Sequence, residues 1–343
     1  MEKIKFNLRL FDGNTNVTTD TGLTNEMKTY YSDYLIDNAE PELVHDQFGQ
    51  KQPIPENGGK KIEFRKYDPL PKATTPLTEG VTPNGQKLNM GVITTEVKQY
   101  GGFIELSDML LMTAIDNNLV QATTLLGGQA GRTLDTVVRE VLNGGTNVQY
   151  AEGQVSARNT LKGGAESGNH YLTVRAIRMA VRTLKVMNTP RINGEYVAII
   201  HPDAAYDLMS DPEWKYPHQY QDTTELYNGE IGKVAGVRFV ETTEAKVFNG
   251  AGASGRDVYS TLILGANAYG STEIKGGGLE HIVKQLGSAG TSDPLNQRAT
   301  VGWKATKAAT RLVEAYMVRI ETASTFTLGS IENYSKLIKG VPS

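Results

Sequence analysis

The sequence KKIEFRKYDPLPKATTPLTEG spans residues 60–80, and LNMGVITTEVKQY follows at residues 88–100. Apolar and polar side chains alternate over 60–67 and again over 88–100, which is the period-two pattern of β-strands. The segment between them is polar and contains Pro69, Pro71, Pro76 and Pro83. Proline cannot donate to a strand ladder, so these residues interrupt regular pairing. The sequence therefore predicts an extended hairpin, two strands joined by a long proline-rich tip.

The predicted hairpin offers only a thin apolar face, and an isolated two-stranded ribbon is marginal in water. Such a ribbon needs a surface to lie on. We expect that surface to belong to a neighbouring subunit; a hairpin packed on its own domain is the alternative. The predicted contacts between subunits in this region are Arg65, Lys66, Pro69, Pro76 and Pro83.

The first ten residues also alternate. One side of this predicted strand is apolar and carries Ile4, Phe6, Leu8 and Leu10, which we expect to contact another subunit. The other side carries Lys3, Lys5 and Arg9, which are candidates for diffuse contact with a packaged polyanion. Residues 12–22 are polar and rich in Gly, Asn and Thr, which is typical of a flexible link. The segment is predicted to lie on a neighbour as an added strand, or to fold back on its own body.

Three segments have the apolar spacing of amphipathic helices, at 25–39, 118–142 and 173–187. The second would be about 36 Å long. Its glycines Gly127, Gly128 and Gly131 weaken a helix and predict a bend or a close crossing by another backbone. In the third segment, Thr173 is a predicted cap and the cations Arg175, Arg178, Arg182 and Lys185 face outward. A solvated face or ion pairs with another subunit explain these cations more simply than phosphate binding.

The second half of the chain mixes helices and strands. Residues 196–200 (YVAII) form a continuous apolar run, as in a strand buried on both faces. A short helix ending near Met209 follows, and further strands are predicted at 237–241, 258–264 and 312–321. There is no strict βαβ rhythm and no internal repeat, so the predicted fold class is α+β.

Composition excludes several function classes. The chain has 343 residues, of which 39% are hydrophobic and 21% charged, and a net charge of -3. These values are typical of a globular protein and not of a dedicated nucleic-acid binder. The absence of cysteine excludes disulfides, zinc–thiolate sites and thiol catalysis. We find no secretory signal and no apolar stretch of the roughly 18 residues that span a bilayer.

Candidate chemistry is sparse, so we predict no catalytic, metal or cofactor site. The five histidines do not share ligand spacing. His201 and Asp203 could mimic a base and its orienting carboxylate, but no nucleophile elbow accompanies them, and a turn capping the next helix is the simpler explanation. Residues 250–255 (GAGASG) match a dinucleotide fingerprint in letters alone, because a strand pattern and not a helix follows them.

Several passages, taken in order, resemble the major capsid proteins of tailed bacteriophages with the Hong Kong-type capsid fold, and among them the N-four-like group. The passages are YVAIIHPDAAYDLMSDPEW (196–214), NGEIGKVAGVRFVETTEAKVF (228–248), DPLNQRATVGWKATKAATRLVEAYMVRIE (293–321) and the hairpin sequence at 60–80. The resemblance covers about Thr24 to Thr322. It implies a subunit with an N-terminal arm, an extended loop, a long spine helix, and peripheral and axial domains.

The division that the resemblance implies runs in seven segments. They are the N-terminal arm (1–24), an N-terminal helix and connection (25–59), the extended loop (60–100), the peripheral domain with the spine helix (101–194), the axial domain (195–290), the return strands of the peripheral domain (291–325) and the C-terminal tail (326–343).

The implied function is that of a major capsid protein, which self-assembles into pentamers and hexamers of an icosahedral head enclosing double-stranded DNA. Assembly would take place in the bacterial host cytoplasm, with scaffolding, decoration and portal proteins as separate partners. Two alternatives remain: another virion protein such as a tube or fibre component, or a hydrolase using His201 and Asp203.

Overall fold

The structure is a computed structural model. It describes Leu35 and residues 37–39, 42–54, 60–67, 70–77, 79–82, 84–113, 118–151, 156–163, 170–214, 232–273, 279–288 and 293–326. The predicted strand at 1–10 and most of the predicted helix at 25–39 lie outside these residues, although Leu35 and residues 37–39 are helical. The chain divides into two compact units, one of residues 1–42, 101–131 and 279–305, and a larger one of residues 43–100, 132–278 and 306–343.

The larger unit is built on a seven-stranded sheet. Its strands follow the order β5-β15-β10-β6-β8-β7, and β9 pairs with β10 outside this path. Their bounds are β5 Val148–Tyr150, β6 Tyr196–Ile200, β7 Lys233–Val234, β8 Val237–Glu241, β9 Val247–Phe248, β10 Val258–Leu264 and β15 Met317–Thr322. Every residue of β6, β10 and β15 is buried, which confirms the central strand predicted at 196–200.

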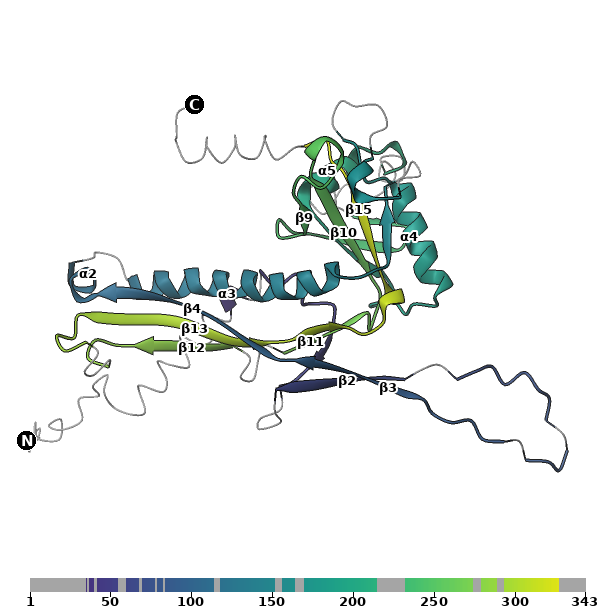
Figure 1. The fold of residues 1–343 in the computed structure, drawn as a ribbon, viewed down its shortest axis with the longest axis horizontal. Helices are drawn as coiled ribbons and strands as arrows, with labels where there is room; N and C mark the ends of the chain where they lie inside the picture. Colours follow the sequence, from purple (N-terminus) through teal and green to yellow (C-terminus); the bar gives the residue numbers. More distant parts are fainter. Residues whose placement is uncertain are drawn as a thin grey trace, which may run out of the picture. The chain divides into compact units, whose positions relative to one another are not determined.

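Helices pack against both faces of this sheet (Figure 1). Successive side chains along a strand point to opposite faces and therefore meet different helices. Ala198 in β6 and Ile263 in β10 share a core with α4 (Val174–Val186) and α5 (Pro202–Ser210). Their neighbours Ile199 and Leu262 point the opposite way, into a core with the later part of α3 (Asn118–Asn143). This is the period of two that a strand imposes on its side chains.

Helix α4 confirms the prediction at 173–187. The Thr173 side chain accepts a hydrogen bond from the backbone N–H of Ala176, as an N-cap does. Its buried face carries Val174, Ile177, Val181 and Leu184, as expected. Arg175, Arg178, Arg182 and Lys185 are all exposed.

The strand predicted at 312–321 begins later in the structure, at Met317. Leu312 follows the short strand β14 (Ala309–Arg311), and residues Glu314–Tyr316 form a 3₁₀ helix before β15 starts at Met317. The backbone N–H groups of Leu312 and Val313 both donate to the carbonyl of Ala268, so this stretch turns around a distant loop. The pattern of alternating side chains continues through a turn that local sequence does not reveal.

The predicted hairpin is present in the larger unit. Strand β2 (Lys61–Tyr67) pairs antiparallel with β3 (Met90–Glu96), with Phe64 opposite Ile93. A second small sheet has the order β1-β11-β14, in which β1 (Gln50–Gln52) runs parallel to β11 (Tyr269–Thr272). The predicted strand at 88–100 is divided, because β3 ends at Glu96 and β4 (Lys98–Ser107) joins another sheet.

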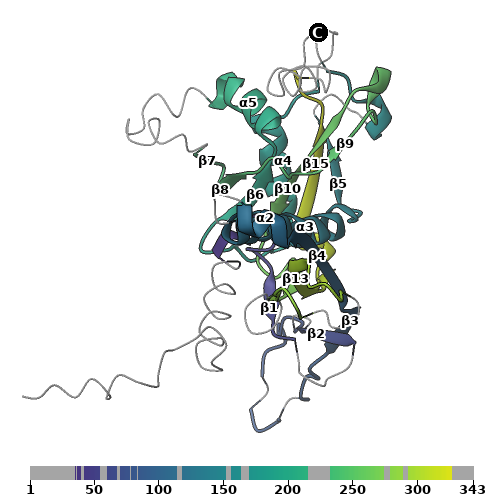
Figure 2. The ribbon, with the colours of Figure 1, turned by 90° about the vertical axis from the view of Figure 1, so that its left-hand side faces the viewer.

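The smaller unit holds the short helix α2 (Asp108–Thr113) and a three-stranded sheet with the order β12-β13-β4, where β12 is Leu279–Lys284 and β13 is Arg298–Lys307. The division between the units falls within β4, α3 and β13. The Trp303 indole N–H donates to the side-chain oxygen of Gln129 at 3.1 Å, which ties β13 to α3 within this unit. Figure 2 shows the ribbon turned by 90°.

The glycines of α3 confirm the predicted close crossing. A Cβ atom on Gly127 would lie 3.0 Å from the carbonyl oxygen of Leu35, and one on Gly131 would lie 2.5 Å from that of Ala39. Side chains at either position would displace the helical turn that contains Leu35 and Ala39.

None of the helices in the described residues has the length and hydrophobicity that a membrane span requires.

Candidate intersubunit surface

The base of the hairpin is anchored in the larger unit. Ile62 and Phe64 are buried in a cluster with Leu312, and Ile93 packs against it. Phe64 is 0% exposed, because its ring lies against Gly270 of β11, where a Cβ atom would overlap the ring. The hairpin therefore leaves the body of the unit from a fixed point.

Beyond this base, the hairpin has no core of its own. Residues 70–77, 79–82 and 84–89 form no regular strand and are all exposed. The exposed apolar side chains of the hairpin are Leu70, Leu77, Val81, Leu88, Met90 and Val92. Leu77 is 78% exposed and Leu88 69% exposed, values expected for side chains that meet nothing in their own subunit.

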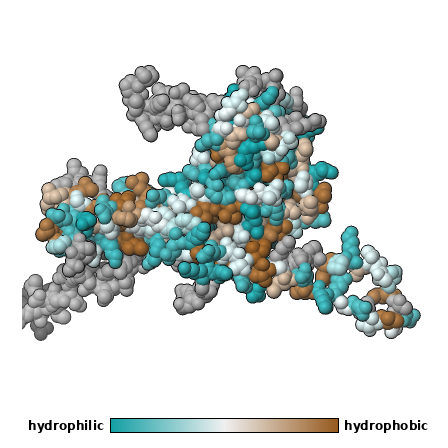
Figure 3. All heavy atoms as spheres, viewed as in Figure 1, coloured by the Kyte–Doolittle hydropathy of each residue, from teal (hydrophilic) through white to brown (hydrophobic). Residues whose placement is uncertain are grey.

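We call the side chains of Leu70, Leu77, Val81 and Leu88 the tip surface. Figure 3 shows apolar patches along the projecting hairpin, between hydrophilic ones. Exposed apolar groups scattered singly are ordinary, but several gathered on a thin projection mark an interaction site. Burial of such a side chain on a partner stabilises the contact by about 1.5–3 kcal/mol. The hairpin tip therefore has the chemistry of a docking surface.

The predicted contact residues fall in different places. Arg65 and Pro76 are exposed on the hairpin, as a contact residue must be before assembly. Lys66 belongs to β2, but its side chain is outside the described structure. Pro69 and Pro83 lie outside the described residues, as do the predicted contacts of the first ten residues, Ile4, Phe6, Leu8 and Leu10, and the candidate DNA-facing cations Lys3, Lys5 and Arg9.

The sequence reasoning missed the tip surface itself. It selected prolines and cations on the hairpin, whereas the exposed leucines and valine carry the apolar area. A signal was present, since Leu70, Leu77, Val81 and Leu88 interrupt an otherwise polar segment. These apolar residues do not recur every two or every 3.6 residues, and so they matched the pattern of neither a strand nor a helix.

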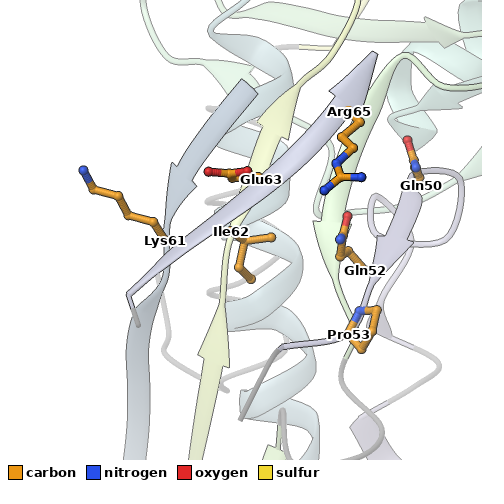
Figure 4. Close-up of a pocket in the computed structure, with 7 residues that line it drawn as sticks. All are labelled: Gln50, Gln52, Pro53, Lys61, Ile62, Glu63 and Arg65. Atoms are coloured by element: carbon orange, nitrogen blue, oxygen red, sulfur yellow. The ribbon is translucent and has the colours of Figure 1, made fainter. Parts of the chain in front are cut away.

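A shallow cavity of about 580 Å³ opens at the hairpin base (Figure 4). Its walls come from β1 and β2, and the Arg65 guanidinium extends toward the side of Gln50 and Gln52. The remaining lining residues are Pro53, Lys61, Ile62 and Glu63. The wall therefore offers amide and charged side chains beside one apolar side chain, Ile62.

A buried polar cluster fixes the segment that leads into β1. Lys307, fully buried, donates from Nζ to Asp46 Oδ1 at 2.7 Å and to the carbonyl of Thr272 at 2.7 Å. Lys51 pairs with the other oxygen of Asp46. Burial raises the pKa of the Asp46 carboxyl, but Lys307 and Lys51 outweigh it, and the net shift is downward. Burial lowers the pKa of Lys307 to about 8, because its attraction to the Asp46 carboxylate offsets only part of the desolvation.

The neighbouring residue His45 extends the cluster. Its backbone N–H and its Nδ1 each lie 2.6 Å from a carboxylate oxygen of Asp135 on α3. The Tyr269 hydroxyl donates to the His45 carbonyl and accepts from the N–H of Phe48. Burial raises the pKa of Tyr269, so its proton stays on the hydroxyl. All these groups are used in holding the fold together.

His201 and Asp203 form a helix cap. His201 Nδ1 accepts a hydrogen bond from the N–H of Asp203 at 3.2 Å, which begins α5. The Asp203 carboxylate accepts from the Tyr259 hydroxyl at 2.7 Å. Burial lowers the pKa of His201, and burial raises that of Tyr259. An imidazole bonded through Nδ1 to a backbone N–H is oriented by the helix start, as the simpler sequence interpretation predicted.

The glycine-rich segment 250–255 lies in the loop between β9 and β10, which pair antiparallel. Gly250 and Gly255 have φ values of 63° and 72°, a conformation that glycine adopts without strain. A strand and not a helix follows the segment, as the sequence pattern indicated, and the glycines form the loop of a hairpin. Among the described residues, no group of three or more His, Asp or Glu side chains could hold a metal ion.

Comparisons with known proteins agree with this geometry. A family model described as phage capsid protein matches residues 91–320. No curated protein sequence matches the chain. Among solved structures, the capsid of Ralstonia phage GP4 has a TM-score of 0.60 at 14% identity, over 82% of this chain and 88% of the other.

Two cyanophage capsids are similarly close. That of Pam1 has a TM-score of 0.59 at 15% identity, covering 84% of this chain and 92% of the other. That of P-SCSP1u has a TM-score of 0.58 at 15% identity, covering 82% and 88%. At this identity the similarity demonstrates the fold, which confirms the mixed α+β capsid fold expected from the sequence.

Proposed function

The chain belongs to the phage capsid protein family, and on this premise we propose that it is the major subunit of an icosahedral head, assembled as pentamers and hexamers around double-stranded DNA. A capsid protein of this family is a structural subunit of the virion shell and not an enzyme. The hydrolase alternative built on His201 and Asp203 is accordingly set aside. Self-association is the activity that remains to be explained.

The observation that carries the proposal is the anchored hairpin with its unpartnered tip surface. The base is fixed by Phe64, while Leu77 and Leu88 extend into solvent. Interfaces of obligate assemblies commonly bury about 2,000 Å² or more. A projecting loop adds interface area without enlarging the core of the subunit. Its ordering lowers the entropy, and contacts in the shell offset this cost.

The remaining contacts follow from the same logic. Arg65, Lys66, Pro69, Pro76 and Pro83 would meet an adjacent subunit along the hairpin. The apolar side of the first ten residues would meet another, and Lys3, Lys5 and Arg9 would face the packaged DNA. In this scheme residues 60–100 are the extended loop, and residues 195–290 are the axial domain around the five-fold and quasi-six-fold centres.

We further propose that the subunit has the Hong Kong-type arrangement and is related to the N-four-like group, on the strength of the passages at 196–214, 228–248 and 293–321. Assembly would take place in the cytoplasm of the bacterial host. Scaffolding, decoration and portal functions would be supplied by separate proteins.

Sedimentation of the expressed protein, followed by electron microscopy of the fast fraction, tests the proposal. We expect closed particles of megadalton size. Open tubes would favour the tube or fibre alternative, and a small soluble oligomer at high concentration would contradict shell assembly altogether.

A further inference from the structure

Helix α5 has an exposed apolar face. Tyr206, Met209 and Ser210 follow one another at the spacing that places them on one side of a helix, and all three are exposed. Tyr206 is 55% exposed and Met209 39% exposed. The opposite side of α5 packs into the main core through Ala204 and Leu208. The exposed face is therefore an apolar strip on a helix that is fixed in place.

The chain leaves the larger unit at this face. The backbone N–H of Thr325 donates to Oδ2 of Asp207 on α5 at 3.1 Å, and the Thr325 hydroxyl donates to Oδ1 of the same carboxylate. The ring of Phe326 meets that of Tyr206 edge-on, with 5.2 Å between the ring centroids. Phe326 is itself 37% exposed, so this contact leaves part of the apolar strip open. The segment that follows Phe326 thus starts from a fixed point on α5.

That segment has the sequence pattern of a short amphipathic helix. It reads SIENYSKLIKG at residues 330–340, and its apolar residues gather on one face when placed on a helix. These residues are Ile331, Tyr334, Leu337 and Ile338. Glu332 precedes Lys336 by four residues, a spacing that stabilises a helix. Ser330 and Gly340 are residue types preferred at the start and the end. A helix of fewer than about 12 residues is marginal in water, so it needs a surface that buries its apolar face.

We propose that residues 330–339 dock their apolar face on α5 of the same subunit, over Tyr206, Met209 and Phe326. Only residues 327–329 separate Phe326 from the predicted helix. An extended chain from Phe326 to Ile331 spans up to about 17 Å. Helix α5 has 9 residues and is about 14 Å long. The whole exposed face of α5 is therefore within reach of the segment.

The short tether favours the subunit's own α5 over that of another copy. A short flexible linker gives a tethered segment an effective concentration in the millimolar range. In a micromolar solution of unassembled subunits, the α5 face of another copy is about a thousand times more dilute. Docking within one chain thus precedes assembly, and the inference does not depend on the proposed function.

Hydrogen exchange of the unassembled full-length subunit, measured on the peptide that covers residues 330–339, tests the proposal. We expect exchange slower by about tenfold or more than in a free peptide of the same sequence. The variant Y206S/M209S removes the apolar strip and should abolish this protection. The matched control M179S/M187S changes two methionines of α4 and its C-cap that are 49% and 50% exposed, and it should retain the protection.

A reciprocal variant separates docking from the folding of α5. I331S/I338S changes only the segment, so α5 stays intact while the protection is lost; K336S/K339S, which changes the polar face, should keep it. Three results would overturn the proposal: a parent in which the segment exchanges as fast as the free peptide, protection that survives in Y206S/M209S or in I331S/I338S, or protection that rises with subunit concentration. The last result would place the segment on a neighbouring copy. Shell formation is measured separately by sedimentation, so none of these results bears on the capsid function.

Discussion

Lys307 and Asp46 lie 261 positions apart in the sequence, yet the Nζ of one donates to Oδ1 of the other at 2.7 Å inside the larger unit. This pair links the last residue of β13 to the segment that enters β1. The hairpin base lies beyond that segment in the chain. The pair therefore helps to fix the position of the hairpin base.

Replacing Lys307 with Met should destabilise the unassembled subunit by about 3–5 kcal/mol, because the buried Asp46 carboxylate loses the fully buried one of its two cations. Chemical denaturation of the unassembled subunit measures this. The double variant D46N/K307M is the control. We expect it to lose less than the sum of the two single variants, since the stranded charge disappears with its partner. Strict additivity would mean that the pair is not coupled.

The Asp46 carboxylate should make the free energy of unfolding depend on pH in the acid range. Its pKa in the folded protein lies below the usual 3.8, so the unfolded chain binds this proton more readily as the pH falls. The stabilisation is fully present above about pH 4 and is lost as the pH falls through the lower, folded value. The difference in unfolding free energy between the parent and D46N should therefore shrink as the pH falls below about 4. A constant difference over that range would show that Asp46 is not the titrating group.

Gly270 should be intolerant of any side chain. Replacing it with Ala forces a methyl group into the Phe64 ring, and overpacking of this kind costs about 1–3 kcal/mol. Gly85, on the hairpin, has nothing within 4 Å of a Cβ and serves as the matched control. The thermal midpoint of G270A should fall while that of G85A stays within a degree or so of the parent. Equal midpoints would mean that Phe64 does not anchor the hairpin.

The N-cap of α4 can be tested by substituting Thr173. Thr173→Ala removes the acceptor for the Ala176 N–H and should cost about 1 kcal/mol. Thr173→Ser retains the oxygen and should cost less. Denaturation midpoints measure both effects. If Thr173→Ser lowered the midpoint as much as Thr173→Ala, the side-chain oxygen would not be capping the helix.

Local pattern was enough to predict the elements that it controls directly. The hairpin strands, α3, α4 and the buried strand at 196–200 depend on alternation, helical spacing or a cap, all of which can be seen within a short window. Even the crossing at Gly127 and Gly131 was expected from the residues alone. The contact predictions at Arg65, Pro76 and the other named residues remain predictions.

The elements that were missed depend on distant partners. Strand β13 has ten residues and ends in the buried Lys307, a residue that no hydrophobic pattern would place in a core. Glu321 in β15 is likewise buried, because Arg158 binds it through two hydrogen bonds of 2.7 Å. A charged side chain becomes a core residue only when its counter-ion arrives from elsewhere in the chain, and spacing does not encode that.

The central claim is that the tip surface binds a sister subunit, and sedimentation velocity of the variant L70S/L77S/V81S/L88S tests it most directly. These side chains are exposed, so the subunit should fold with the parent's denaturation midpoint. The variant K72S/T74S/T82S/K87S, which changes polar residues of the same loop, is the control and should form particles. We predict closed megadalton particles for the parent and the control, and only small, folded species for the tip variant. Particles of parental size from the tip variant would contradict the account.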